Sequence, residues 1–311
     1  MELYAGLEAV PAGLGPSAVT IGKFDGVHLG HRGVLTQLRT LAADRGLAPV
    51  VVTFDRHPMA LLRPESCPVA LVSNAQRAAL LAESRLAATV ELEFTRELSE
   101  LAPEEFVQRV LVAKLDTRLV LVGADFRFGH RGAGDVATLR ALGERFGFEV
   151  ALLDDVRVDG DRVSSTKVRD HLAAGEVRAA ATLLGRFPRV RSTVVHGDAI
   201  GRELGFPTAN LDPDMEGFLP ADGVYAAWTW IDGVRYPSAV SIGNNPTFDG
   251  IPARRTEAHL IDADVDAYGK PIEVEFVEYV RPMRRFDGMA ELAAALAADV
   301  VRIRALLAAE N

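Results

Sequence analysis

The sequence contains little cysteine, few lysines and no long uninterrupted apolar run. Its single cysteine, Cys67, excludes an internal disulfide and any zinc site built from cysteines, and we expect no chemical role for it. The most apolar late stretch, residues 292–307, is interrupted by Asp299, Arg302 and Arg304. This stretch therefore predicts an amphipathic helix and not a membrane span.

Basic residues are also fewer than acidic ones. The chain has 34 Lys and Arg residues and 43 Asp and Glu residues, which gives a formal net charge of −9. Such a chain has no global electrostatic attraction to nucleic acid or to an anionic membrane, so we expect small-molecule partners. The first 22 residues carry no Lys or Arg, which is not typical of a signal peptide, and we expect a cytoplasmic protein. Whether copies of the chain form a homo-oligomer is left open.

The length of 311 residues, with 49% apolar and 25% charged residues, predicts a folded protein of two domains. In the first half, β-prone runs alternate with segments of helical periodicity. The pattern predicts strands at 18–22, 49–54, 89–93, 118–122 and 148–153, and helices at 31–45, 74–86, 103–114 and 136–146. This alternation indicates an α/β domain with a parallel sheet, whose ligands bind at the carboxyl ends of the strands.

Two short helices are expected at 166–173 and 176–185, and the helical periodicity of the apolar residues stops after them. We therefore place the domain boundary between residues 186 and 187. Short β-prone runs then follow at 193–195, 223–231, 235–242, 256–261 and 272–279. Asp232 and Gly233 join two of these runs and are typical of a hairpin turn. With a last helix at 288–308, residues 187–311 are predicted to form a small antiparallel β-barrel with a terminal helix.

Residues 22–31 link the first strand to the first helix and have the composition of a phosphate-binding loop. Its glycines allow close backbone approach, and the free N–H groups of a helix start attract an anion. His28 and His31 add two side-chain donors three residues apart. One such histidine is more often a capping or packing residue, but two within this glycine frame favour a nucleotide site.

A second dense segment covers residues 196–210 and ends with Thr208 and Asn210, two residues apart. A flexible glycine-rich loop is the alternative interpretation. Two oxygen-bearing side chains at this spacing could reach one Mg²⁺ ion, which accepts few protein ligands because it keeps water and phosphate. Glu257 lies on a β-prone run, where a lone glutamate more often faces solvent.

The loop at 22–31 resembles the His-x-Gly-His signature of the nucleotidyltransferase superfamily, in the form seen in the bacterial bifunctional riboflavin kinase/FMN adenylyltransferase (FAD synthetase) family. Segments 53–58, 123–129 and 164–169 also resemble that family, in the same order. Arg56 stands where the family usually has proline. The resemblance implies a Rossmann-like nucleotidyltransferase domain over residues 1–186.

For this domain the resemblance implies that the FMN phosphate attacks the α-phosphorus of ATP, while His28 and His31 stabilise the developing charge. No better general base is evident, and positioning and charge stabilisation carry such a reaction. The further residues implied in nucleotide and flavin binding are Gly22, Phe24, Asp25, His57, Asp125, Ser164, Ser165, Thr166 and Arg169.

The second segment resembles the Pro-Thr-Ala-Asn motif of riboflavin kinases. The resemblance implies that Thr208 and Asn210 bind Mg-ATP as metal ligands, that Gly205 belongs to the nucleotide loop, and that Glu257 is the catalytic base for the ribityl 5′-hydroxyl. Ile200 replaces an arginine often seen in that family. Segments 222–225, 241–248 and 256–260 match the family in order.

The implied function is therefore two-step flavin cofactor synthesis: riboflavin and ATP give FMN, and FMN and ATP then give FAD and pyrophosphate, with Mg²⁺ as cofactor. One alternative is another His-x-Gly-His adenylyltransferase that acts on a pantetheine or nicotinamide nucleotide. That class does not account for Thr208, Asn210 and Glu257. The other alternative, a flavin-binding sensor or carrier without catalysis, does not account for the intact set of candidate catalytic residues.

Overall fold

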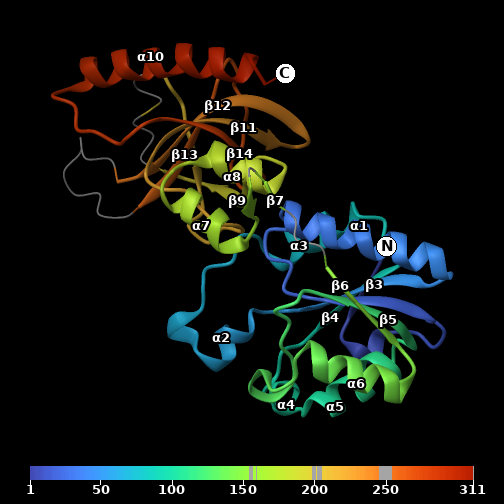
Figure 1. The fold of residues 1–311 in the computed structure, drawn as a ribbon. Helices are drawn as coiled ribbons and strands as arrows, with labels where there is room; N and C mark the ends of the chain where they lie inside the picture. The colour runs from blue at the N-terminus through green and yellow to red at the C-terminus, as the bar shows by residue number, and fades with distance from the viewer. Residues whose placement is uncertain (154–156, 159, 198–200, 202–204, 245–253, 311) are drawn as a thin grey trace. The chain divides into compact units, whose positions relative to one another are not determined.

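The computed structural model describes residues 1–153, 157–158, 160–197, 201, 205–244 and 254–310. The chain forms two compact units, Met1–Val163 and Ser164–Asn311 (Figure 1). Among the described residues, no helix has both the length and the apolar character that crossing a membrane requires.

The first unit is built on a six-stranded sheet in the order β1-β4-β3-β2-β5-β6, with every neighbouring pair parallel. Its strands are β1 (Glu2–Ala5), β2 (Ser17–Ile21), β3 (Ala48–Phe54), β4 (Ala88–Leu92), β5 (Thr117–Val122) and β6 (Glu149–Leu152). The predicted parallel sheet is confirmed. Strand β1 was not predicted, because this short edge strand is mostly exposed and carries no apolar run.

Helices cover both faces of this sheet (Figure 1). Alternate strand residues point to opposite faces, so Ala18 packs into one core and Val19 into the other. The first core lies under α1 (Leu29–Arg45) and α3 (Asn74–Ala82), and the second under α6 (Val136–Phe146) and the π-helical turn Val107–Val112. The shorter elements are α2 (Pro58–Leu62), α4 (Arg96–Glu100), α5 (Pro103–Phe106), the 3₁₀ turns Leu7–Ala9, Pro64–Ser66 and His130–Gly132, and a small hairpin of β7 (Arg157–Val158) and β8 (Asp161–Arg162).

The sheet has its topological switch point beside β2. The chain leaves β2 for β3 on one side, and β5 later pairs with the other side of β2. Ligands of open α/β sheets bind at such a point, beyond the carboxyl ends of the strands. The loops that follow β2 and β5 begin at Gly22 and Gly123, and both belong to the predicted nucleotide and flavin segments.

The second unit begins with α7 (Ser165–Ala173) and α8 (Val177–Leu184) and continues as a closed barrel in the order β10-β13-β12-β11-β14-β9. The barrel strands are β9 (Arg189–Val195), β10 (Ala209–Leu211), β11 (Gly223–Ile231), β12 (Val234–Gly243), β13 (Arg255–Leu260) and β14 (Pro271–Arg281). All the pairings are antiparallel, which confirms the predicted barrel. The β11–β12 turn has positive φ at Asp232 (52°) and Gly233 (77°), as a tight hairpin turn requires.

The terminal helix α10 (Met289–Ala308) packs on the barrel, as predicted. Its Ile303 and Leu307 join a core with Trp228 of β11 and Val277 of β14. Helices α7 and α8 are also fastened to the barrel unit: Ala221 N donates to Leu172 O at 3.0 Å, and Arg178 Nε donates to Glu278 Oε2 at 2.7 Å.

Candidate active sites

The loop after β2 is tightly folded over buried apolar side chains. Phe24, Gly26 and Val27 all have positive φ, at 50°, 79° and 38°. The side chains of Phe24 and Val27 hold the loop in place, because both are buried in the core under α1. Phe24 is only 2% exposed. Phe24 was predicted in the ligand site, and the structure places its ring in this core, 5.1 Å from the ring of His31.

The two histidines of the loop lie together at the start of α1. His28 is 5% exposed and caps the helix, because its Nδ1 accepts the His31 backbone N–H at 3.3 Å. The two rings stack with centroids 3.7 Å apart. A Cβ on Gly30 would lie 3.0 Å from the His28 ring and 3.4 Å from the Val163 carbonyl oxygen, so glycine gives the close packing here. Both imidazoles therefore sit at the positive end of a 17-residue helix.

A cavity of about 280 Å³ opens beside this loop. Asp25 lines it and fixes its wall, since the carboxylate accepts the Leu71 backbone N–H at 2.8 Å. His57 also lines it and caps α2 by accepting the Met59 backbone N–H at 3.1 Å. Cys67, for which no role was expected, lies in the same wall. The cavity thus gathers residues from the loops after β2 and β3.

Arg56, which departs from the family pattern, forms an ion pair with Asp55 at 2.8 Å in this wall. Burial alone would raise the pKa of Asp55, but the hydrogen bonds from Arg56 and from the Phe94 backbone outweigh it and hold the pKa below its usual value. Asp55 consequently stays ionised and ties the second predicted loop to the end of β4.

The loop after β5 is held by Asp125, which accepts two hydrogen bonds from the Arg162 guanidinium, both at 3.1 Å. The hydrogen bond from Arg162 lowers the pKa of Asp125 against a partial opposing effect of burial. Phe126 and Phe128 stack in the same loop with ring centroids 5.5 Å apart. The loop therefore contains an ionised carboxylate and a stacked aromatic pair.

The predicted segment at residues 164–169 forms the start of α7. Ser164 caps this helix, since its Oγ accepts the Lys167 backbone N–H at 3.3 Å. Ser165, Thr166 and Arg169 follow within the first turns of the helix. These residues belong to the second compact unit, so their part in the nucleotide site of the first unit stays a prediction.

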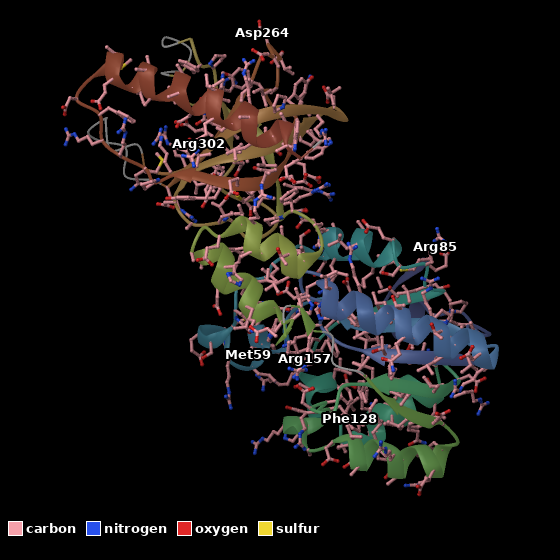
Figure 2. The ribbon with its side chains drawn as sticks, turned by 45° about the horizontal axis from the view of Figure 1, so that its top comes forward. Met59, Arg85, Phe128, Arg157, Asp264 and Arg302 are labelled. Carbon is pink, nitrogen blue, oxygen red and sulfur yellow. The ribbon has the colours of Figure 1, made fainter. Side chains whose placement is uncertain are left out.

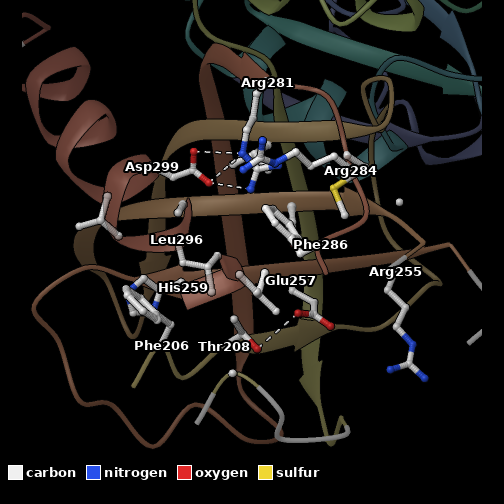
Figure 3. A pocket seen from close by; sticks show the side chains of 18 of the residues that line it. Phe206, Thr208, Arg255, Glu257, His259, Arg281, Arg284, Phe286, Leu296 and Asp299 are labelled. Carbon is white, nitrogen blue, oxygen red and sulfur yellow. Dashed lines mark hydrogen bonds and ion pairs between the residues drawn. The ribbon is translucent and has the colours of Figure 1, made fainter. Parts of the chain in front are cut away.

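The second site is a cavity of about 120 Å³ in the barrel unit (Figure 3). Its wall has a polar part and an apolar part. The polar part includes Thr208, Asn210, Ser241, Arg255, Glu257 and His259, and the apolar part includes Phe206, Met283, Phe286, Leu292, Leu296 and Val300. A cavity of this kind fits a ligand that is polar at one end and aromatic at the other.

The strand register brings the three predicted residues of the polar part together. Asn210 of β10 lies opposite Glu257 of β13, and Thr208 Oγ1 donates to Glu257 Oε2 at 3.5 Å. Gly205 precedes them with a φ of 81°, which favours glycine. His259, to which no role was given, fastens this segment by donating from Nδ1 to Pro207 O at 2.8 Å. Ile200 lies outside the described residues.

The donors at this site are hard oxygens, which suit Mg²⁺. The Thr208 hydroxyl, the Asn210 amide and the Glu257 carboxylate line one cavity. Within the described parts of the chain, no three His, Cys, Asp or Glu side chains form a metal-binding cluster. Three oxygen-bearing side chains could serve an ion that takes few protein ligands and keeps most of its contacts to water and phosphate.

An ion pair in the cavity wall was missed by the sequence reasoning. Arg281 of β14 makes three hydrogen bonds with Asp299 of α10, at 2.7, 3.0 and 3.1 Å, and Asp299 is only 7% exposed. Nearby, the Arg284 guanidinium lies 4.5 Å from the centre of the Phe286 ring (Figure 3). The available signal was an acidic residue at the same helical spacing as the buried Leu292 and Ile303.

Together, the fold and the two cavities define a class of protein: a two-site transferase acting on phosphate groups. One site carries paired histidines at a helix start beside the switch point of a parallel sheet. The other carries a carboxylate, a hydroxyl and an amide in the cavity of a closed barrel.

Comparisons with known proteins identify the family. The family described as FAD synthetase matches residues 11–167, and the family described as riboflavin kinase matches residues 184–307. The bifunctional riboflavin kinase/FMN adenylyltransferase of Pseudomonas fluorescens is 38% identical over 99% of this chain and 98% of its own length. The protein of the same name from Escherichia coli K12 is 36% identical over 92% of this chain and 91% of its own length. The chain belongs to the bifunctional riboflavin kinase/FMN adenylyltransferase family.

A solved structure also resembles the whole chain. It is described as a macrolide-efflux protein from Streptococcus pneumoniae, and it superposes with a TM-score of 0.86 at 28% identity. The similarity covers 98% of this chain and 99% of that one, so both units of the fold recur there.

Proposed function

We propose that the two cavities are separate active sites and that each performs one of the two reactions for which the relatives are named. The barrel site phosphorylates riboflavin to FMN, and the parallel-sheet site transfers AMP from ATP to FMN. The observation that carries this proposal is that each unit gathers its own candidate catalytic set: His28 with His31 in one, and Thr208 with Glu257 in the other.

In the barrel site, Glu257 takes the proton of the ribityl 5′-hydroxyl as that oxygen attacks the γ-phosphorus of ATP. The P–O bond to the new ester forms as the bond to ADP breaks. The apolar wall around Phe286 and Leu292 supports the flavin ring. Thr208 and Asn210 would hold Mg²⁺, which neutralises phosphate charge when it is bound.

In the parallel-sheet site, a phosphate oxygen of FMN attacks the α-phosphorus of ATP, and pyrophosphate leaves with the electrons of the broken P–O bond. The attacking phosphate is already an anion, so the reaction needs little general base. His28, His31 and the start of α1 stabilise the negative charge that develops on the phosphates. Asp25, His57 and Asp125 shape the binding loops that surround the reacting groups.

The remaining assignments follow from this arrangement. We place the boundary between the catalytic domains after Arg186, with residues 187–311 forming the kinase domain. The reaction partners are small molecules, with no role for nucleic acid, and the enzyme works in the cytoplasm with Mg²⁺. The family pattern, the acidic charge balance and the polar side chains that line the two cavities support these assignments.

The experiment is to incubate the purified protein with riboflavin and Mg-ATP and to separate the flavins by chromatography. We expect FMN first and FAD later, with one pyrophosphate released for each FAD. Unchanged riboflavin, with flavin retained on the protein, would instead identify a carrier. Turnover of a pantetheine or nicotinamide nucleotide in preference to FMN would identify a different adenylyltransferase.

A further inference from the structure

One row of side chains crosses five strands of the barrel on the face that carries the second cavity. Asn210 of β10 lies opposite Glu257 of β13, and Glu257 lies opposite Ser241 of β12. Ser241 in turn lies opposite Val224 of β11, which pairs with Arg281 of β14. All five residues line the cavity. The strand pairing therefore fixes their order along its wall, and Ser241 is the polar member of this row that has no role so far.

The strand directs the Ser241 side chain into this cavity. Successive residues of a strand point to opposite faces, and the two neighbours of Ser241, Val240 and Ile242, are both 0% exposed. Ser238 lies on their face, where its hydroxyl donates to Tyr236 O at 3.2 Å. In the part of the chain that the structure describes, no hydrogen bond joins the Ser241 hydroxyl to another residue. This hydroxyl is therefore a polar group of the wall that a ligand can use.

The two ends of the row differ in chemistry. Asn210 supplies an oxygen proposed for Mg²⁺ at the β10 end, so in the proposed function the phosphates of ATP lie there. At the other end, Val224 belongs to the core that includes Ile303 of α10. Arg302 ties the same helix to β14, because its Nη1 donates to Val280 O at 2.9 Å (Figure 2). Since α10 supplies much of the apolar wall, the flavin ring of the proposed function lies at this end.

Glu257 and Ser241 lie between these ends, on neighbouring strands. Directly opposed residues of an antiparallel pair have Cβ atoms about 4.5–5.5 Å apart. In the proposed reaction, Glu257 takes the proton of the ribityl 5′-hydroxyl. From that carbon the substrate chain runs toward the flavin ring, so it passes the strand position of Ser241 first. The next carbon of the chain carries the 4′-hydroxyl, which therefore comes within reach of the Ser241 hydroxyl.

We propose that Ser241 determines specificity in the kinase site, and that its hydroxyl binds the ribityl 4′-hydroxyl, next to the hydroxyl that is phosphorylated. The proposal rests on the function proposed above for the second unit. A serine hydroxyl can donate and accept, so it suits another hydroxyl in either direction. A site that hydrogen-bonds a substrate hydroxyl discriminates against the analogue that lacks it. The contact would also hold the 5′-oxygen beside Glu257.

The test compares riboflavin with 4′-deoxyriboflavin as substrates of the whole chain with Mg-ATP. Ser241→Ala removes the hydroxyl and keeps the Cβ atom. The control is Ser192→Ala, which removes the hydroxyl of a serine on β9 that donates to Asp212 O at 2.9 Å. The measured quantity is kcat/KM of each enzyme with each substrate. Any difference in intrinsic reactivity between the two substrates is the same for all three enzymes, so it cancels when their preferences are compared.

We expect the preference for riboflavin to be about three- to tenfold smaller in Ser241→Ala than in the wild type, the usual weight of a hydrogen bond between uncharged groups. The whole loss should fall on riboflavin, and 4′-deoxyriboflavin should react equally well with both enzymes. Ser192→Ala should keep the wild-type preference.

Two outcomes would overturn the proposal. One is an equal fall with both substrates in Ser241→Ala, which would show that the hydroxyl acts on Glu257 and not on the ribityl chain. The other is a preference within twofold of the wild-type value. A wild-type protein that phosphorylates neither substrate would instead overturn the proposed function.

A measurement on the wild type alone decides if Ser241→Ala fails to fold, as judged by its thermal unfolding. The probes are 5′-deoxyriboflavin, which cannot be phosphorylated, and 4′,5′-dideoxyriboflavin, and the measured quantity is the Kd of each by calorimetry. Binding of 5′-deoxyriboflavin about three- to tenfold tighter would support the contact to the 4′-hydroxyl. Equal affinities would refute it.

Discussion

Breaking the buried Arg281–Asp299 ion pair should loosen α10 from the barrel. Removing one partner from a buried pair typically costs 3–5 kcal/mol, because the other charge is left uncompensated. Here the Arg281 side chain keeps 19% of its exposure and the Asp299 side chain 9%, so the lower end applies, about 3 kcal/mol for Asp299→Asn. At roughly 2 to 4 °C per kcal/mol, the melting temperature of the barrel unit should fall by about 6 to 12 °C.

The two tryptophans of the chain, Trp228 and Trp230, both lie on β11, so their fluorescence reports the unfolding of the barrel unit alone. The matched control is Asp262→Asn, because Asp262 also pairs with α10, through Arg304 at 2.6 Å, but with both side chains more than half exposed. Such a pair contributes about 1 kcal/mol or less.

Asp299→Asn should also raise the KM for riboflavin, since α10 carries Leu292 and Leu296 in the cavity wall, while conversion of supplied FMN stays unchanged. The double variant Arg281→Met with Asp299→Leu should regain most of the lost stability, because it leaves no unpaired charge. A shift for Asp299→Asn no larger than that for Asp262→Asn would refute this reasoning.

Further predictions concern the metal site and the domain boundary. Thr208→Ala should lower the rate of riboflavin phosphorylation and raise the Mg²⁺ concentration needed for half-maximal rate, as a titration of initial rates will show; an unchanged Mg²⁺ requirement would argue against Thr208 as a ligand. A fragment of residues 187–311 should fold and phosphorylate riboflavin, since it is far longer than the roughly 40 residues below which unaided folding becomes difficult. A fragment of residues 164–311 should melt at a higher temperature, because it keeps α8, which packs on β14 and buries Val177, Ala180, Leu183 and Leu184; equal melting temperatures would show that α7 and α8 add nothing.

Much of the fold could be predicted because its signals are local. Runs such as residues 49–54 and the helical spacing in residues 31–45 specify a parallel sheet with covering helices, and Asp232-Gly233 specifies a hairpin. The strands β1 and β10 were missed for the opposite reason. They have 4 and 3 residues, too few to show a period, and exist because neighbouring strands pair with them.

In the candidate sites, too, residues within local motifs could be predicted from the sequence, whereas contacts between distant segments could not. His28, His31, Thr208 and Glu257 stand in dense motifs, so their residue types and order single them out as candidates. The contacts that the motifs do not contain join distant segments: Lys23 meets His57 across 34 positions, and Arg281 meets Asp299 across 18. Each of these residues alone resembles an ordinary surface or helix residue. Only the register of β2 with β3, and the packing of α10 on the barrel, pairs them.

The most direct test of separate active sites compares the flavins made by Glu257→Gln and by the double variant His28→Ala with His31→Ala. Glu257→Gln keeps the side-chain size but removes the base, so phosphorylation of riboflavin should fall at least about a hundredfold while supplied FMN still becomes FAD. The histidine variant should show the reverse pattern, with riboflavin converted to FMN that accumulates. Loss of both reactions in either folded variant, or a wild-type rate of phosphorylation in Glu257→Gln, would contradict the account.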